Sequence, residues 1–98
     1  MKKFDLPCLD RCKSFYGKAT VTERNGAVIL TSYNTEVCGI INGEFQRYWT
    51  GESATTTRHI NSFLKLYDMD GGGLAWWRQQ PVVNFNWIDF YIGTPVEA

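Results

Sequence analysis

The sequence predicts a single α+β domain over residues 1–98, with a small antiparallel β-sheet covered by one main α-helix. The expected sheet is a four-strand meander joined by a C-terminal strand. Three observations lead to this prediction. Two Asn-Gly pairs separate β-rich segments, an apolar stripe with helical spacing follows them, and the C-terminal residues alternate as they do in a strand. A length of 98 residues fits one domain.

The meander is predicted at about residues 15–49. Asn-Gly pairs stand at positions 25–26 and 42–43. They suit type I′ turns, because both residues tolerate positive φ and this turn matches the twist of paired strands. Residues 32–35, Ser-Tyr-Asn-Thr, give a third reversal. The expected strands are residues 15–24, 27–33, 36–41 and 44–49. Residues 1–14 are expected to form an irregular lead-in or a short helix after Pro7.

The main helix is predicted at about residues 55–67. Ser53, Thr55 and Thr56 each offer a hydroxyl for the N-cap. The apolar stripe then follows the 3.6-residue period: Ile60, Phe63, Leu64 and Tyr67. A sheet with one apolar face needs a cover, and this helix provides it.

Two further elements are predicted after the main helix. Three consecutive glycines at 71–73 break any regular element, and a short helix is expected at about residues 74–80, before Pro81. A tail strand is expected at about residues 83–92. Because this segment carries apolar side chains on both faces, we expect it to be buried between the sheet and a second copy of the chain, as a homodimer.

The composition argues against several classes of protein. Lys+Arg and Asp+Glu number 10 each, so the net charge is zero and a strongly basic nucleic-acid-binding domain is not indicated. No run of 18 apolar residues is present, so no membrane span is expected. The charge is nevertheless uneven. Residues 1–26 hold six basic and three acidic residues, whereas residues 68–98 hold one basic and four acidic.

Chemistry-bearing residues are few, and we expect no enzymatic activity, no cofactor, no metal and no small-molecule substrate. Cys8, Cys12, Cys38 and His59 form a nominal zinc-ligand set. Only one half of it has the usual spacing, so free cysteines packed as small hydrophobes are the favoured interpretation. His59 is expected to be a packed or capping residue, because no nucleophile motif accompanies it. The odd number of cysteines and the absence of a secretory segment favour a reducing cytoplasm.

Two alternative interaction surfaces are predicted. Adjacent residues of a helix point about 100° apart, so one of Trp76 and Trp77 is expected to be exposed or covered by a partner. The alternative is that one tryptophan covers the sheet and the other seals the tail strand. The expected partner-binding residues are Trp76, Trp77, Arg78, Trp87, Asp89 and Tyr91.

The second surface would suit single-stranded nucleic acid, which needs aromatic faces and guanidinium groups. Cations that alternate with aromatic residues along the meander and the helix suggest it, and Tyr16, Lys18 and Tyr33 belong to this alternation. The residues expected to carry the binding are Arg47, Tyr48, Trp49 and Arg58.

Three segments carry a resemblance to a known family: residues 14–19 (SFYGKA), 32–35 (SYNT) and 53–63 (SATTTRHINSF). Over residues 13–83 the chain resembles a family of small uncharacterised proteins encoded by phages and mobile elements of Gram-positive bacteria. The resemblance implies an accessory role in the conflict between element and host. We therefore expect a non-catalytic protein of the bacterial cytoplasm that binds and inhibits a host defence protein, for example an anti-CRISPR acting on Cas9 with its guide RNA. The alternative expectation is a single-stranded nucleic-acid-binding module.

Overall fold

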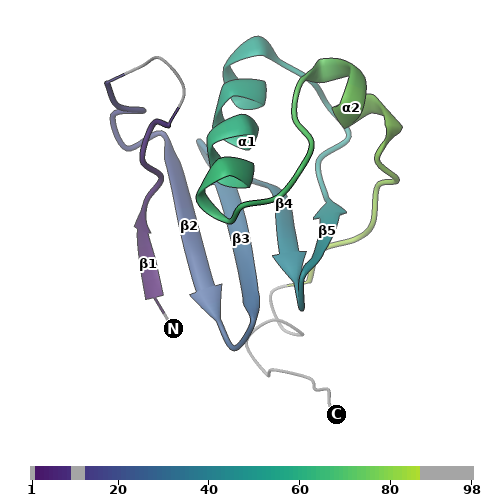
Figure 1. The fold of residues 1–98 in the computed structure, drawn as a ribbon, viewed down its shortest axis with the longest axis horizontal. Helices are drawn as coiled ribbons and strands as arrows, with labels where there is room; N and C mark the ends of the chain where they lie inside the picture. The colour runs from purple at the N-terminus through teal and green to yellow at the C-terminus, as the bar shows by residue number, and fades with distance from the viewer. Residues whose placement is uncertain (1, 10–12, 87–98) are drawn as a thin grey trace.

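One antiparallel sheet and two helices make up the computed structural model, which describes residues 2–9 and 13–86 (Figure 1). The sheet has five strands whose spatial order follows the sequence. They are β1 (Lys2–Asp5), β2 (Ala19–Arg24), β3 (Ala27–Ser32), β4 (Thr35–Ile41) and β5 (Glu44–Arg47). Helices α1 (Ala54–Leu66) and α2 (Leu74–Gln79) follow, and both lie on the same side of the sheet (Figure 1). The predicted α+β class is confirmed.

The tight turns of the meander have the predicted backbone conformation. Asn25 and Gly26 have φ of 45° and 83°, and Asn42 and Gly43 have φ of 52° and 84°. Consecutive positive φ values are what a type I′ turn requires. The third reversal also begins with positive φ, at Tyr33 (φ 57°). The pairing of β3 with β4 then shifts between Leu30 and Thr31, as at a β-bulge.

The fifth strand of the sheet differs from the prediction, because it comes from the N-terminus. Residues 1–14 were expected to be irregular or helical, but β1 pairs antiparallel with β2 and sets Phe4 opposite Val21. The first strand of the meander also starts later than position 15, at Ala19. The segment before it closes a turn in which the Lys18 amide donates to the Phe15 carbonyl at 3.0 Å.

The predicted tail strand lies largely outside the described residues. Residues 83–86 belong to no strand of the structure, and Val82 forms a single parallel bridge with Arg47, at the end of β5, the last strand in the sheet order. Phe85 then reaches Tyr48, with ring centroids 4.8 Å apart. Residues 87–92 of the prediction are not described.

Helix α1 covers the sheet as predicted, within one residue at each end. Ser53 is its N-cap, and its hydroxyl accepts from the Thr56 amide at 3.0 Å. Buried residues of the helix and of the strands below it form the core. Among them are Ile60, Phe63 and Leu64 from α1, and Val21, Leu30 and Cys38 from the sheet. In the described part of the chain, no helix is both long and apolar enough to cross a bilayer.

Candidate functional site

A pocket of about 370 Å³ opens where the N-terminal half of α1 meets residues 13–18 and the turn between β3 and β4. In Figure 1 this is the upper end of the molecule, where α1 begins. Side chains from all three segments line it, among them Lys13, Tyr16, Lys18, Tyr33, Arg58 and His59. We call it the tyrosine pocket.

Both tyrosines of the pocket stand on left-handed backbone. Tyr16 has φ of 53° and is followed by Gly17 at 77°, and Tyr33 has φ of 57°. The two turns are joined, because the Tyr33 amide donates to the Lys18 carbonyl at 2.7 Å. Left-handed conformation is uncommon for a bulky residue and costs about 1–3 kcal/mol. Tyr16 and Tyr33 are also at the surface, 76% and 54% exposed.

His59 forms the inner wall of the pocket and is only 1% exposed. Phe15 packs against its ring edge-on, with centroids 4.5 Å apart. Its Nδ1 lies 2.8 Å from the Ser32 hydroxyl, which is also 3.2 Å from the Thr56 hydroxyl. Burial lowers the pKa of His59, and the charges of Arg58 and Lys18 lower it further. The prediction of a packed histidine is confirmed, and the lowered pKa favours the neutral ring.

The Ser32–His59 pair resembles part of a nucleophile–base arrangement, but its geometry is that of a core contact. Ser32 is 3% exposed, and its Oγ lies between His59 and Thr56 inside the core. A nucleophile has to reach a substrate as well as its base. This pair therefore fastens α1 to the end of β3 and offers no attacking atom to the pocket.

The charge of the tyrosine pocket is positive. Lys13, Lys18 and Arg58 line it, and no Asp or Glu does. Within residues 2–9 and 13–86, none of these three cations forms an ion pair or a side-chain hydrogen bond. Unneutralised cations around a concave surface attract anions. The pocket is thus suited to a negatively charged group.

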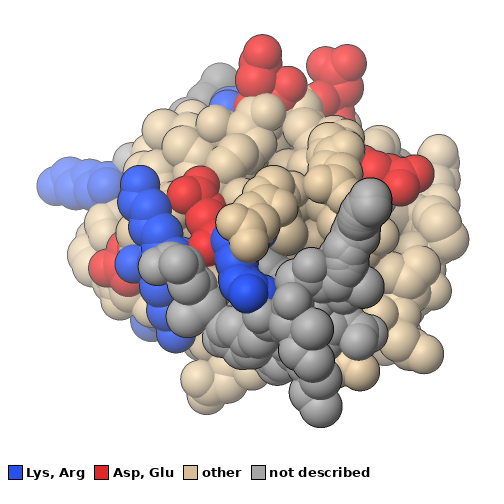
Figure 2. All heavy atoms as spheres, turned by 90° about the horizontal axis from the view of Figure 1, so that it is seen from below, with Lys and Arg blue, Asp and Glu red and all other residues tan. Residues whose placement is uncertain are grey.

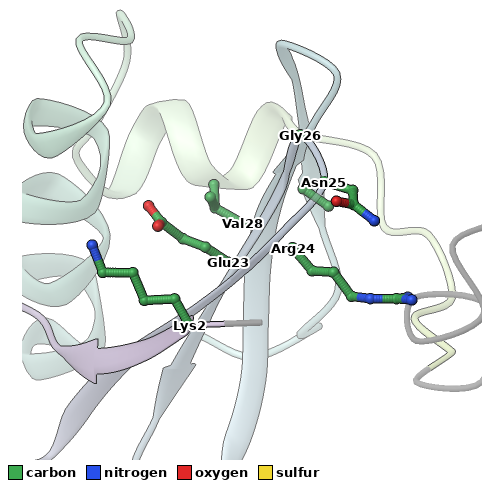
Figure 3. Close-up of a pocket in the computed structure, with 7 residues that line it drawn as sticks. Lys2, Glu23, Arg24, Asn25, Gly26 and Val28 are labelled. Carbon is green, nitrogen blue, oxygen red and sulfur yellow. The ribbon is translucent and has the colours of Figure 1, made fainter.

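A second, more open pocket of about 520 Å³ lies at the opposite end, beside the turn between β2 and β3 (Figure 3). Lys2 and Glu23 project on the same side there, whereas Arg24 points away. Glu23 accepts from the Tyr67 hydroxyl at 2.5 Å. Burial raises the pKa of Tyr67, and Glu23 raises it further. Figure 2, which views the molecule from below, shows basic and acidic side chains side by side on this end. Because the opposite charges offset each other, this pocket is the weaker candidate.

Among the residues predicted to bind a partner, Trp77 is a core residue. It is 1% exposed, and its Nε1 donates to the Gly51 carbonyl at 2.9 Å. This corrects the expectation that Trp77 contacts a partner, because the folded chain offers no surface of its ring. The sheet takes both tryptophans, since Trp76 is half-buried on Phe45 with ring centroids 4.9 Å apart.

The other predicted partner residues divide between the surface and the part of the chain that is not described. Arg78 is exposed and forms a bidentate pair with Glu52, with distances of 2.8 and 3.0 Å. Trp87, Asp89 and Tyr91 lie outside the described residues.

The four residues predicted to bind nucleic acid do not form one surface. Arg47 is 7% exposed and donates to backbone carbonyls, so it is a structural residue and not a phosphate contact. Tyr48 and Trp49 are half-buried beside it. Arg58 lines the tyrosine pocket, to which the other three do not contribute. The burial of Arg47 corrects the prediction, because charge spacing along a strand does not reveal which cation is turned inward.

The sequence contained part of the signal for the tyrosine pocket. Tyr16, Lys18 and Tyr33 belong to the alternation of cations and aromatic residues, but that pattern does not distinguish them from its other members, and Lys13 lies outside it. The feature that does distinguish the two tyrosines is that each is followed by a turn-forming residue. Gly17, which follows Tyr16, is the residue type that a left-handed turn favours, and Asn34, which follows Tyr33, is a residue type common in turns.

The nominal zinc ligands are not assembled into a site that the structure describes. Cys38 is a free, buried thiol whose pKa is raised by burial. Cys8 takes part in a disulfide bond, which corrects the expectation of a free thiol there. Cys12 lies outside the described residues. Over the described ranges, no three His, Cys, Asp or Glu side chains stand close enough to hold a metal ion.

Fold and site together define a small α+β protein with a cationic pocket rimmed by tyrosines. Residues 5–79 match the model of a family of unknown function (DUF8033), and the chain belongs to that family. No curated protein and no solved structure matched the chain. The matched region contains every residue that lines the tyrosine pocket.

Proposed function

We propose that the chain is a non-catalytic binding protein that inhibits a defence protein of a bacterial host, for example a Cas9-type nuclease with its guide RNA. One observation supports a binding role over a catalytic one. Three groups of the kinds used in nucleophilic and acid–base catalysis, Ser32, Cys38 and His59, are buried, whereas large aromatic and charged side chains remain at the surface. The resemblance to proteins of phages and mobile elements supplies the proposed setting, which is the host cytoplasm.

The surface that we propose for this partner runs from α2 into the C-terminal residues. Trp76 and Arg78 are its accessible members in the described part of the chain. Trp87, Asp89 and Tyr91 are proposed from the sequence alone. Residues 68–98 carry one basic and four acidic residues, and such a segment is able to occupy a basic nucleic-acid channel as phosphate does.

A cleavage assay tests the proposal directly. The full chain is added to Cas9 loaded with guide RNA, and cleavage of a matched DNA target is followed together with retention in a pull-down. We expect retention and slower cleavage, both weakened by Arg78→Ala and by Trp76→Ala. Lys3→Ala serves as the control, because Lys3 is an exposed cation on β1, away from α2. Unchanged cleavage with no retention would refute this choice of target.

A second candidate, a single-stranded nucleic-acid-binding module, is favoured by the three cations and two exposed tyrosines of one pocket. Of the residues first expected to bind nucleic acid, Arg58 is the one that lines this pocket. Binding of an oligonucleotide should weaken steeply with added salt. Fluorescence titration at two salt concentrations measures it, and a salt-independent signal would argue against the module.

A homodimer formed through the C-terminal residues is also part of the proposal. It rests on the two-sided apolar pattern of the predicted tail strand. Light scattering coupled to size exclusion measures the mass of the full chain in solution. A mass near 11.3 kDa at high concentration would refute the dimer.

A further inference from the structure

We infer that the tyrosine pocket binds a nucleoside phosphate, with the phosphate on its cations and the base on its tyrosine rings. The inference rests on the same pocket as the second candidate function and deepens it by naming the ligand class. It goes beyond the proposed inhibitor, because a free nucleotide would satisfy it without a nuclease or a polynucleotide. The ligand chemistry is the same whether the nucleotide is free or belongs to a single strand.

The cations give the pocket its preference for phosphate. Lys13 and Lys18 come from the loop before β2, and Arg58 comes from α1, so they reach the pocket from two sides. A guanidinium binds phosphate with two parallel hydrogen bonds, whereas an ammonium acts as a point charge. Burial is the main cause of the lowered pKa of His59, and the charges of Arg58 and Lys18 lower it further, which agrees with their position around the pocket. The pocket therefore has a positive electrostatic potential, because no acidic side chain lines it.

The tyrosines give the pocket its preference for a flat aromatic base. Tyr16 and Tyr33 are 76% and 54% exposed, and the Tyr33 ring lies tilted beside His59 with ring centroids 6.0 Å apart. Both also stand on left-handed backbone, and such strain concentrates at ligand-binding sites. Bases of any sequence stack on tyrosine, since each has a π face. Exposure and strain at the same two residues are explained together if the rings serve as a stacking platform.

The size of the pocket limits the ligand to about one nucleotide. Its volume of about 370 Å³ is near the lower end of the range for small-molecule sites. The inner wall is closed by His59 and Phe15, which are both buried. A polynucleotide would place one nucleotide here and continue outside.

Calorimetry on the full chain at low salt tests the inference with five probes. They are adenosine 5′-monophosphate, uridine 5′-monophosphate, an oligothymidylate, inorganic phosphate and O-phosphotyrosine. We expect both mononucleotides or the oligonucleotide to bind at least tenfold more tightly than inorganic phosphate, because stacking adds to the phosphate contact. Tighter binding of the oligonucleotide identifies a single strand as the source, and equal or tighter binding of the mononucleotides identifies a free nucleotide.

Three variants connect the binding to the pocket. Arg58→Ala should weaken binding roughly tenfold, the usual effect of losing one charge-assisted hydrogen bond. Tyr33→Asn should weaken it by a similar factor, and asparagine tolerates the left-handed backbone at this position. Lys3→Ala, which removes an exposed cation from β1, should leave the affinity unchanged. Thermal unfolding of each variant establishes that it is folded.

Several results would overturn the inference. They are the absence of binding by every nucleotide probe, equal binding of inorganic phosphate, preference for O-phosphotyrosine, and affinity unaffected by Arg58→Ala. Failure here is distinguishable from failure of the proposed function. Arg78→Ala should impair inhibition of the nuclease and leave nucleotide affinity intact, whereas Arg58→Ala affects the nucleotide.

Discussion

Removing the guanidinium of Arg47 should destabilise the fold more than removing any exposed cation. Arg47 ends β5, and its Nε donates to the Trp49 carbonyl at 2.8 Å. Its two terminal nitrogens donate to the carbonyls of Trp77 and Thr50, both at 2.9 Å. The guanidinium also lies 4.4 Å from the centre of a Trp77 ring. One side chain thus joins the sheet edge, the loop before α1 and helix α2.

The size of the effect follows from these contacts. A hydrogen bond to a charged group contributes about 1.5–3 kcal/mol, and water entering the vacated space recovers part of it. A cation–π contact contributes about 0.5–2 kcal/mol. We expect Arg47→Ala to lower the free energy of unfolding by about 3–5 kcal/mol, as for other buried charged partners. A domain of this size has about 5–15 kcal/mol in all. Arg47→Lys should recover less than half, because an ammonium lacks the planar fork.

Urea unfolding followed by tryptophan fluorescence measures the change. The midpoint should fall while the dependence on urea stays the same, since the surface exposed on unfolding is unchanged. Arg78→Ala is the matched control, because Arg78 is exposed and its pair with Glu52 is at the surface. A loss below about 1 kcal/mol for Arg47→Ala would refute the reasoning.

Three further perturbations test other parts of the structure. Folding lowers the pKa of His59, so the unfolded chain binds the proton more readily than the folded chain. The free energy of unfolding should therefore fall as the pH drops below about 6.5. His59→Gln should reduce this pH dependence, measured by urea titrations between pH 7.5 and 5.5. Tyr16→Asn should raise the free energy of unfolding by about 0.5–1 kcal/mol in thermal unfolding, since asparagine accepts the left-handed turn, while weakening nucleotide binding. Gly39→Ala should cost about 1–3 kcal/mol, because its Cβ would meet the Val28 carbonyl oxygen at 2.8 Å.

Each of these expectations has a clear contrary result. A slope that persists in His59→Gln would assign the pH dependence to other groups. A less stable Tyr16→Asn would mean that the tyrosine ring contributes more by packing than its backbone costs. Gly43→Asn is the control for Gly39→Ala, because nothing lies within 4 Å of a Cβ at Gly43 and asparagine tolerates its positive φ. Equal effects of the two would contradict the steric argument.

The sequence predicts the fold correctly where short local patterns determine the backbone conformation. Asn25-Gly26 and Asn42-Gly43 specify their turns through positive φ, and Ser53 with the stripe of Ile60 and Phe63 specifies α1. The N-terminal strand was not readable, because Lys2–Asp5 has only four residues, three of them charged. Its conformation depends on pairing with β2, which no local pattern encodes.

The residues that line interaction surfaces could be predicted from the sequence only in part, because tertiary contacts determine which side chains are buried. Arg47 and Arg58 are both cations beside aromatic residues in the sequence, yet one is turned inward to carbonyls and the other lines a pocket. Trp76 and Trp77 were not expected to pack on the same sheet, because adjacent helix residues point about 100° apart. In the structure Trp76 packs on Phe45 of β5, and Trp77 is buried with its Nε1 donating to the Gly51 carbonyl, so both lie against the sheet.

The sequential order of the strands also governs how fast the protein forms and comes apart. Three of the four strand pairs are closed by two-residue turns, so little loop-closure entropy opposes their assembly. The meander is therefore expected to form early, and the contact of Arg47 with the Trp77 carbonyl, 30 residues away, to form late. Interactions made after the transition state act on the unfolding rate. The contacts of Arg47 therefore slow the unfolding of the native protein. Arg47→Ala should raise the unfolding rate and leave the refolding rate nearly unchanged.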